Sequence, residues 1–171
     1  MIFLKKYIAY PFLYDDPSDL KCDFEILTDE LASMIGLLRA FVNQNYLRDE
    51  LEKINELVYH LNPSLRTFVS VTQDDLDWVY ERYIFYKSEN ENLVKRFVIP
   101  QGGICSGYCH VMRSKFKSVV RLLYRHKQNG NEFDNILFNF FNLLSGYFFA
   151  LAIKFNKDEG IAEKEFISKN Y

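Results

Sequence analysis

Four cations at regular spacing are the residues best suited to chemistry in this sequence. They follow one another at steps of four: Arg113, Lys117, Arg121 and Arg125. Four residues of an α-helix turn about 400°, so these side chains form one slowly drifting stripe. Like charges at this spacing repel, which favours an anionic ligand such as phosphate, because Arg forks and Lys point charges both bind it. A solvated face, or ion pairs with acidic helices, is the plainer alternative.

Two other groups of chemical interest precede the stripe. The Gly102-Gly103 pair next to a helix start could offer backbone N–H groups to an anion, although no P-loop pattern follows and a plain turn explains it as well. Cys105, Cys109 and His110 could suggest a metal. On a helix the two Cys share a face, but His110 lies about 100° from Cys109 and no fourth ligand cluster appears. We therefore expect buried thiols, a hydrogen-bonded His110 and no bound metal.

The elements that must position these residues can be read from the apolar spacing. Apolar residues recur at steps of three and four, the helical period, over Thr28–Val42, Leu47–Leu61, Leu76–Ile84, Ile104–Lys127 and Glu132–Asn156. Pro63 interrupts the second stretch, which residues 65–71 could continue. The last stretch is apolar nearly all round, which predicts a helix buried on most sides.

Several acids are interpreted as helix signals. Thr72 with Asp75 resembles a helix start. Asp29-Glu30 and Asp74-Asp75 look like first-turn acids favoured by the helix dipole, not like a catalytic pair of carboxylates.

Four or five long helices with short links predict an all-α, up-down antiparallel bundle of about five helices. The 171 residues suit a single domain over 1–171, with an irregular segment over 1–23. The charged tail over 157–171 is expected to fray or to add a short helix.

Composition excludes several classes of protein. A net charge of −2 argues against a nucleic-acid binder driven by overall charge. Three Cys give no even disulfide framework, which fits a reducing compartment. No unbroken apolar stretch reaches the ~18 residues of a membrane span, and the N-terminus is a poor signal peptide. We expect a cytoplasmic protein with no membrane partner.

Three blocks of sequence carry a family resemblance. They are "TDELASMIGLLRA" (Thr28–Ala40), "FVIPQGGICSGYCHVMR" (Phe97–Arg113) and "FNLLSGYFFALAI" (Phe141–Ile153). In this order and spacing they resemble the ATP:cob(I)alamin adenosyltransferases of the trimeric five-helix-bundle type. The resemblance implies a homotrimer with sites between subunits, and ATP with Mg²⁺ and cobalamin as ligands.

The family's cationic cluster carries over only in part. Its Arg after the His block falls on Arg113. Its following Arg-Arg-x-Glu-Arg cluster falls on four positions: Lys117, Ser118, Val120 and Arg121. One Arg is thus Lys here, one is Ser, and the Glu is Val.

The other site elements of the family are also altered. The Asn of the last block falls on Asn142, but the next Arg is Leu143 and the Asp is Gly146. The family's N-terminal Thr-Arg-Thr-Gly-Asp-x-Gly phosphate loop has no counterpart. Paired charges that disappear together are what a repacked helix interface tolerates.

Three hypotheses about function follow. The first is a non-catalytic relative that acts as a binding or interaction protein, with a residual pocket for an anion or a corrinoid between subunits. The second is an adenosyltransferase with a rebuilt ATP site that uses Arg113, Lys117, Arg121 and Asn142. The third is a structural oligomer in which the stripe pairs with acids such as Glu30, Asp29 or Asp77.

Overall fold

Five long helices and two short ones make up the fold of the described residues. The computed structural model describes residues 9–94 and 97–170. The long helices are α1 (Lys21–Phe41), α2 (Asn45–Leu61), α3 (Gln73–Glu89), α5 (Ile104–Gln128) and α6 (Ile136–Asp158). The short ones are the 3₁₀ helix η2 (Pro11–Tyr14) and the single turn α4 (Glu91–Val94). The all-α up-down bundle predicted from the sequence is confirmed.

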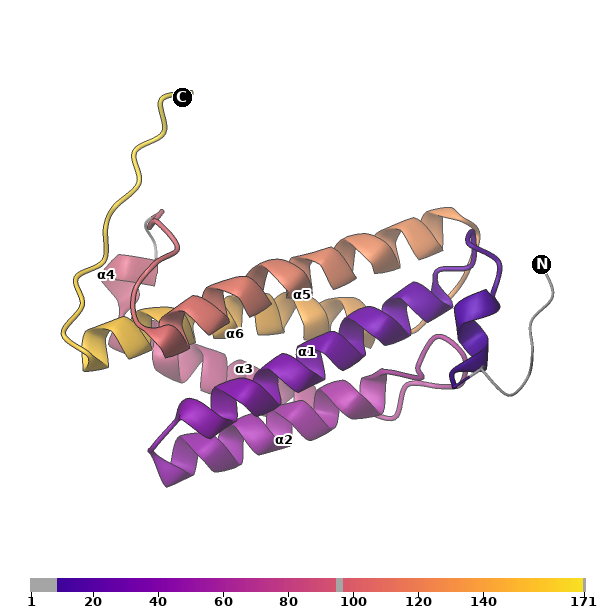
Figure 1. Ribbon diagram of the computed structural model, residues 1–171, viewed down its shortest axis with the longest axis horizontal. Helices are drawn as coiled ribbons and strands as arrows, with labels where there is room; N and C mark the ends of the chain where they lie inside the picture. The colour runs from indigo at the N-terminus through magenta and orange to yellow at the C-terminus, as the bar shows by residue number, and fades with distance from the viewer. Residues whose placement is uncertain (1–8, 95–96, 171) are drawn as a thin grey trace.

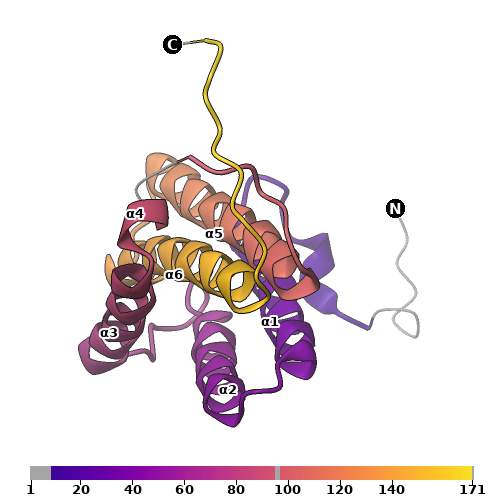
Figure 2. The same ribbon diagram turned by 90° about the vertical axis from the view of Figure 1, so that its left-hand side faces the viewer.

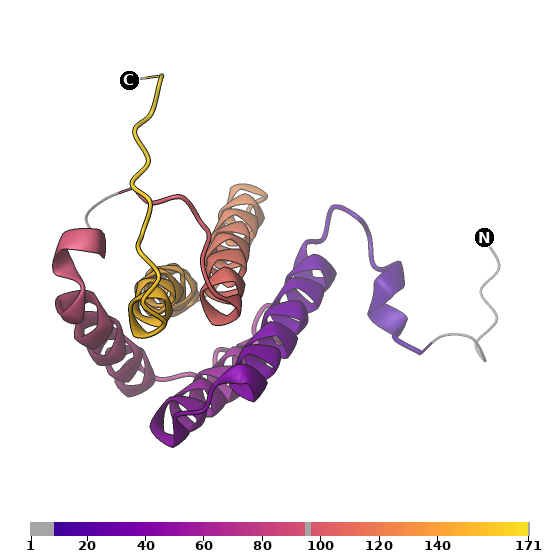
Figure 3. The same ribbon diagram turned by 60° about the vertical axis from the view of Figure 1, so that its left-hand side comes forward.

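Helix α6 lies in the middle of the bundle. It packs against α5 on one side and α3 on the other, while α1 packs against both α2 and α5 (Figures 1 and 2). Turning the molecule by 60° shows α1 and α2 as a pair beside the other three long helices (Figure 3).

Aromatic side chains fill the core around α6. The residues of α6 that are fully buried include Phe140, Phe141, Tyr147 and Phe148. The ring of Phe116 on α5 stacks on Phe148, with the centroids 5.3 Å apart. By length and composition α6 could cross a membrane, but 61% of its most apolar window is buried inside the bundle. This burial agrees with the helix buried on most sides that the sequence predicts.

The first helix begins earlier than the apolar pattern predicted. Helix α1 starts at Lys21 instead of Thr28, so residues 21–23 of the expected irregular segment are helical, and residues 1–8 of that segment lie outside the described residues. Phe24 is fully buried in the added turns, and its carbonyl accepts a hydrogen bond from the Thr28 hydroxyl at 2.8 Å. Asp29-Glu30 therefore lies in the middle of a helix, and its interpretation as a first-turn acidic pair is wrong.

The second and third helices are joined by a non-helical link. Residues 65–71 form a turn and extended chain and do not continue α2. Helix α3 begins with the predicted cap: the Thr72 side chain accepts from the Asp75 N–H, and the Asp75 carboxylate accepts from the Thr72 N–H. Asp74 and Asp75 are first-turn acids, as predicted.

The tail beyond α6 adds no helix among the described residues. Its chain runs antiparallel to the segment before α5, with a bridge between Val98 and Glu165. The N–H of Ile99 donates to the Lys164 carbonyl at 2.9 Å. The tail thus neither frays from the bundle at Asp158 nor forms the short helix that was expected.

Candidate anion-binding face

The predicted cation stripe lies on one side of α5. Lys117, Arg121 and Arg125 are exposed. Arg113 is half-buried, and its guanidinium lies 5.2 Å above the Phe149 ring of α6. In the part of the chain that the structure describes, none of the four makes an ion pair, and the Nε of Arg113 has no hydrogen-bond partner. We call Arg113, Lys117, Arg121 and Arg125 the α5 cation face.

The acids that could have neutralised this face lie elsewhere. Glu30 pairs with Lys115, which is off the stripe, at 2.6 Å. Asp29 lines a groove between α1 and α2, and Asp77 lines a pocket between α3 and α6. Within one chain, therefore, the described acids do not neutralise the α5 cation face.

Asn142 lies in a separate pocket. It is exposed on α6 and lines a pocket of about 290 Å³ together with Asp77 and Tyr80 of α3. No hydrogen bond joins it to the cations of α5 within the described residues. The structure therefore brings Arg113, Lys117 and Arg121 together on one helix and places Asn142 on the next.

The resemblance loses a charge at four positions. Ser118 is exposed and its hydroxyl donates to the Ser114 carbonyl at 3.3 Å, whereas the other three positions are closed by apolar packing. Val120 and Leu143 are partly buried against the core. A Cβ atom added to Gly146 would lie 3.2 Å from the Tyr83 ring, so this ring occupies the space that a longer side chain would enter. Restoring the family's Asp at position 146 would require Tyr83 to move.

The glycine pair before α5 fastens a loop to α6. The Asn156 amide accepts from the Gly103 N–H at 3.2 Å and donates to the Gln101 carbonyl at 3.0 Å. Gly102 has a φ of 141°, and a Cβ there would lie 1.9 Å from Asn156 Oδ1. Glycine is thus needed for the backbone angle and the close approach, and the N–H of Gly103 is already bonded within the chain.

The cysteines and the histidine at the start of α5 are buried. Cys105 and Cys109 are free thiols. His110 is 5% exposed, but neither of its ring nitrogens has a hydrogen-bond partner among the described residues, so the expectation of a hydrogen-bonded histidine is wrong. Burial, and to a lesser degree the charge of Arg113, lowers the pKa of His110 to about 4. Among the described residues no three His, Cys, Asp or Glu side chains gather as metal ligands would. The lack of a bound metal stays a prediction.

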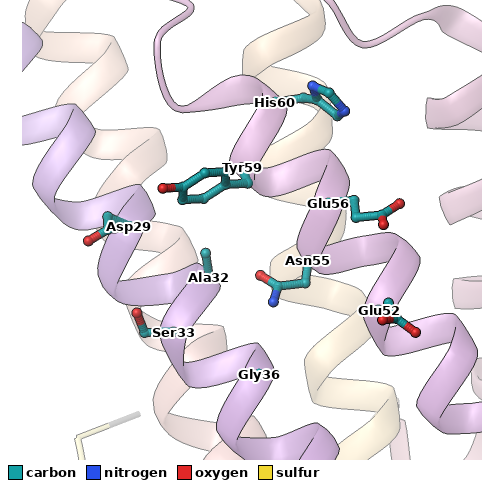
Figure 4. A pocket seen from close by; sticks show the side chains of 9 residues that line it. All are labelled: Asp29, Ala32, Ser33, Gly36, Glu52, Asn55, Glu56, Tyr59 and His60. Atoms are coloured by element: carbon teal, nitrogen blue, oxygen red, sulfur yellow. The ribbon is translucent and has the colours of Figure 1, made fainter.

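A groove between α1 and α2 was not predicted from the sequence. It has a volume of about 760 Å³, and the side chains of Asn55 and Tyr59 reach from α2 toward α1 (Figure 4). Three carboxylates line it: Asp29, Glu52 and Glu56. Glu52 pairs with Arg39 at 2.8 Å, whereas the other two form no ion pair with a described residue. The sequence signal for this groove was the row of small residues on α1: Ala32, Ser33 and Gly36.

The segment in place of the family's phosphate loop is fixed to the start of α1. Arg66 donates to both Glu25 and Asp15, and its guanidinium lies 4.0 Å above the Phe12 ring. The Tyr10 hydroxyl donates to Glu25 at 2.8 Å. Burial and this hydrogen bond raise the pKa of the Tyr10 phenol to about 12. Among the described residues of this segment, Tyr10 and Asp15 thus have partners within the chain.

The family model for cobalamin adenosyltransferase matches residues 25–155. This chain belongs to the cobalamin adenosyltransferase family.

Two curated relatives are similar to it along most of its length. A corrinoid adenosyltransferase of Bacillus subtilis (strain 168) is 26% identical over 160 residues, which cover 88% of this chain and 82% of the relative. A corrinoid adenosyltransferase of Mus musculus is 30% identical over 149 residues, which cover 80% of this chain and 62% of the relative.

Solved structures of a PduO-type ATP:corrinoid adenosyltransferase from Lactobacillus reuteri share the fold. A variant complexed with ATP has a TM-score of 0.74 and 26% identity, with 87% of this chain and 88% of that chain covered. A variant complexed with cobalamin and ATP has a TM-score of 0.72 and 23% identity, with coverage of 89% and 85%.

Proposed function

We propose that this protein is a non-catalytic member of the cobalamin adenosyltransferase family that binds a polyphosphate anion on the α5 cation face. The observation that carries this proposal is the state of the positions around that face. Val120, Leu143 and Gly146 stand where the resemblance places charged residues, and apolar packing closes all three. The loss of these charged residues therefore removes groups needed for catalysis but leaves cations that can bind an anion.

Binding of an anion needs only the charges that remain. Arg113, Lys117 and Arg121 share a helix face and lack carboxylate partners among the described residues. A triphosphate or ATP would meet Arg forks and a Lys ammonium there. Two of the three are exposed to solvent, so binding is weak and decreases as salt increases.

Transfer of an adenosyl group demands more. In this reaction triphosphate is the leaving group of ATP, so negative charge shifts onto the phosphates in the transition state. Preorganised hydrogen-bond donors must therefore surround the phosphates. The sequence has no counterpart of the phosphate loop, and the segment in its place is held by Arg66. Removing one such donor costs about a hundredfold or more in rate.

An anaerobic assay with chemically reduced cobalamin and ATP tests the proposal. We expect turnover below about one per minute, whereas enzymes commonly reach about 1 to 1000 per second. In parallel, ATP or triphosphate should raise the melting temperature, because a ligand that binds the folded state stabilises it. Lys117→Ala should abolish this increase, and Lys169→Ala, which removes one exposed charge from the tail, should leave it intact.

The alternative is an adenosyltransferase with a rebuilt ATP site. Two observations favour it: the curated relatives are corrinoid adenosyltransferases, and three of the family's cationic positions remain basic. Formation of adenosylcobalamin at one per minute or faster, lost in Lys117→Ala, would overturn the non-catalytic proposal in favour of this one.

We further propose that the chain forms a homotrimer in which surfaces of opposite charge meet. The α5 cation face lacks acidic partners, and the α1–α2 groove carries Asp29 and Glu56 without basic ones among the described residues. Two different surfaces that meet head to tail close into a ring when the rotation allows it. Sedimentation should give three times the chain mass at micromolar concentration; a mass near one chain would contradict the trimer.

A further inference from the structure

The turn between α5 and α6 contains the one asparagine of this sequence that is followed by glycine, Asn129-Gly130. Asn129 comes directly after the last residue of α5, and Gly130 begins the loop that leads to α6 (Figure 1). Both residues are exposed to solvent. Neither the resemblance nor the proposed function assigns a role to this turn.

An asparagine followed by glycine can react with its own backbone. The amide nitrogen of the following residue attacks Cγ of the asparagine side chain, a five-membered ring closes, and ammonia leaves. Glycine favours this attack because it has no Cβ beside the nitrogen and because its backbone adopts many angles. Gly130 has a φ of 85°, and a Cβ built there would meet no atom within 4 Å, so the space around this residue is open.

The folded turn holds Asn129 away from the geometry of attack. Its ψ of 8° turns the Gly130 nitrogen away from the Asn129 side chain. The N–H of Asn129 donates to the Arg125 carbonyl at 3.0 Å, and the N–H of Gly130 donates to the Lys127 carbonyl at 3.0 Å. Ring closure therefore requires the end of α5 to open.

Asn131 closes this turn from the other side. Its Nδ2 donates to the His126 carbonyl at 3.2 Å, and its main-chain N–H donates to the same oxygen at 3.4 Å. These bonds lie at the end of a helix, and helix ends fray. Opening of such an exposed end costs much less free energy than unfolding of the whole chain. The side-chain bond of Asn131 therefore limits how often the turn opens.

We propose that Asn129-Gly130 is a site of spontaneous deamidation in the folded protein, and that opening of the α5 end controls its rate. The Gly130 nitrogen loses its proton to solvent and bonds to Asn129 Cγ, while the bond from Cγ to Nδ2 breaks and the side-chain amide leaves as ammonia. Water then opens the ring at either carbonyl and leaves an aspartyl or isoaspartyl residue at position 129. The product carries a new carboxylate four residues after Arg125 of the α5 cation face.

Incubation of the purified protein at mildly alkaline pH, sampled over days, tests this proposal. Tandem mass spectrometry of its peptides measures the conversion of each asparagine, and enzymatic methylation detects isoaspartate. We expect Asn129 to convert at least about tenfold faster than Asn131, which is also exposed but is followed by Glu132. Anion-exchange chromatography should show an acidic form that accumulates over the same time course.

Two variants locate the reaction and its control. Asn129→Gln should lose the isoaspartate signal, because ring closure then needs six atoms, and it should fold because the residue is exposed. Asn131→Ala removes the side-chain bond to the His126 carbonyl. We expect it to raise the rate at Asn129 about 2 to 10 times, as the loss of one hydrogen bond implies. Melting curves check that both variants are folded.

Two results would overturn the proposal. The first is conversion at Asn129 that is no faster than at Asn131 in the natural protein. The second is a rate at Asn129 that Asn131→Ala leaves unchanged, because the turn would then not control the reaction. Neither measurement involves an anionic ligand, so the outcome is independent of the proposed function.

Discussion

The buried carboxylate of Glu50 and the α5 cation face differ in whether their charges are paired within the chain. Glu50 lies in the core, where its Oε1 accepts from the Tyr147 hydroxyl at 2.6 Å and its Oε2 accepts from Arg82 at 2.7 Å and from Tyr86 at 3.2 Å. The four side chains of the α5 cation face have no such partners among the described residues. Charge that the fold needs is paired within the chain, whereas charge left on the surface must be met by water, a ligand or another chain.

The comparison predicts a large loss of stability at the paired carboxylate. Glu50→Ala leaves Arg82 and two phenols without an acceptor, so we expect a loss of about 3 kcal/mol in the free energy of unfolding by urea. This lies at the low end for a buried pair, because the Arg82 side chain is 27% exposed and can reach water. Glu50→Gln keeps an acceptor and should lose less. Equal losses in the two variants would show that packing, not charge, is the main contribution.

A second prediction concerns pH and a buried group on α5 beside the cation face. His110 has a pKa of about 4 in the folded state, lowered from 6.5. The unfolded state therefore binds more protons between these values, and stability falls as the pH decreases from about 6.5 toward 4. We expect His110 to contribute about 2 kcal/mol to the loss between pH 7 and pH 5.

The measurement is the difference between the natural protein and His110→Gln, because carboxylates also titrate in this range. The natural protein should lose about 2 kcal/mol more than the variant over this interval. Parallel pH profiles would mean that His110 is not held neutral by burial.

A third prediction concerns the N-terminal segment. Arg66→Ala removes the partner of Glu25 and Asp15, while Tyr10 still donates to Glu25. We expect a loss of about 1–2 kcal/mol in stability and faster proteolysis between residues 9 and 20. Arg66→Lys keeps the charge but not the two-pronged donor, so it should give an intermediate effect. Unchanged proteolysis would show that Arg66 does not hold this segment.

The smallest effect on stability is expected on the α5 cation face itself. Lys117 is exposed and unpaired, so Lys117→Ala should change the free energy of unfolding by less than about 0.5 kcal/mol. The same variant should nonetheless weaken triphosphate binding, measured by calorimetry at low salt. A marked loss of stability would mean that the lysine has a partner within the fold and would weaken the contrast with Glu50.

Local signals in the sequence were enough for the helices and the cations. The apolar period and the Thr72–Asp75 cap predicted helices that the structure confirms. The placement of Arg113, Lys117 and Arg121 on one face followed from the helical repeat alone. These features depend on neighbours within a few residues in the chain.

What the sequence could not predict depends on contacts between distant residues. Asn156 bonds to the loop around Gly103, more than fifty positions earlier. Tyr83 fills the space beside Gly146 from another helix. The sequence analysis placed the start of α1 too late, at Thr28. The helical turns before Thr28 are stabilised by burial of Phe24 and not by a capping residue that the sequence would reveal. A local sequence pattern does not predict which side chain of another helix will pack at a given position.

The central place of α6 has a consequence for biosynthesis. The helix that packs against both α5 and α3 follows all the other described helices in the chain. At about 5–20 residues per second, the ribosome exposes the apolar faces of α1, α2, α3 and α5 for seconds before α6 emerges. The apolar surface that α6 covers in the folded protein is therefore exposed on the nascent chain. This chain should depend on chaperones that shield apolar surface until residue 158 has left the exit tunnel.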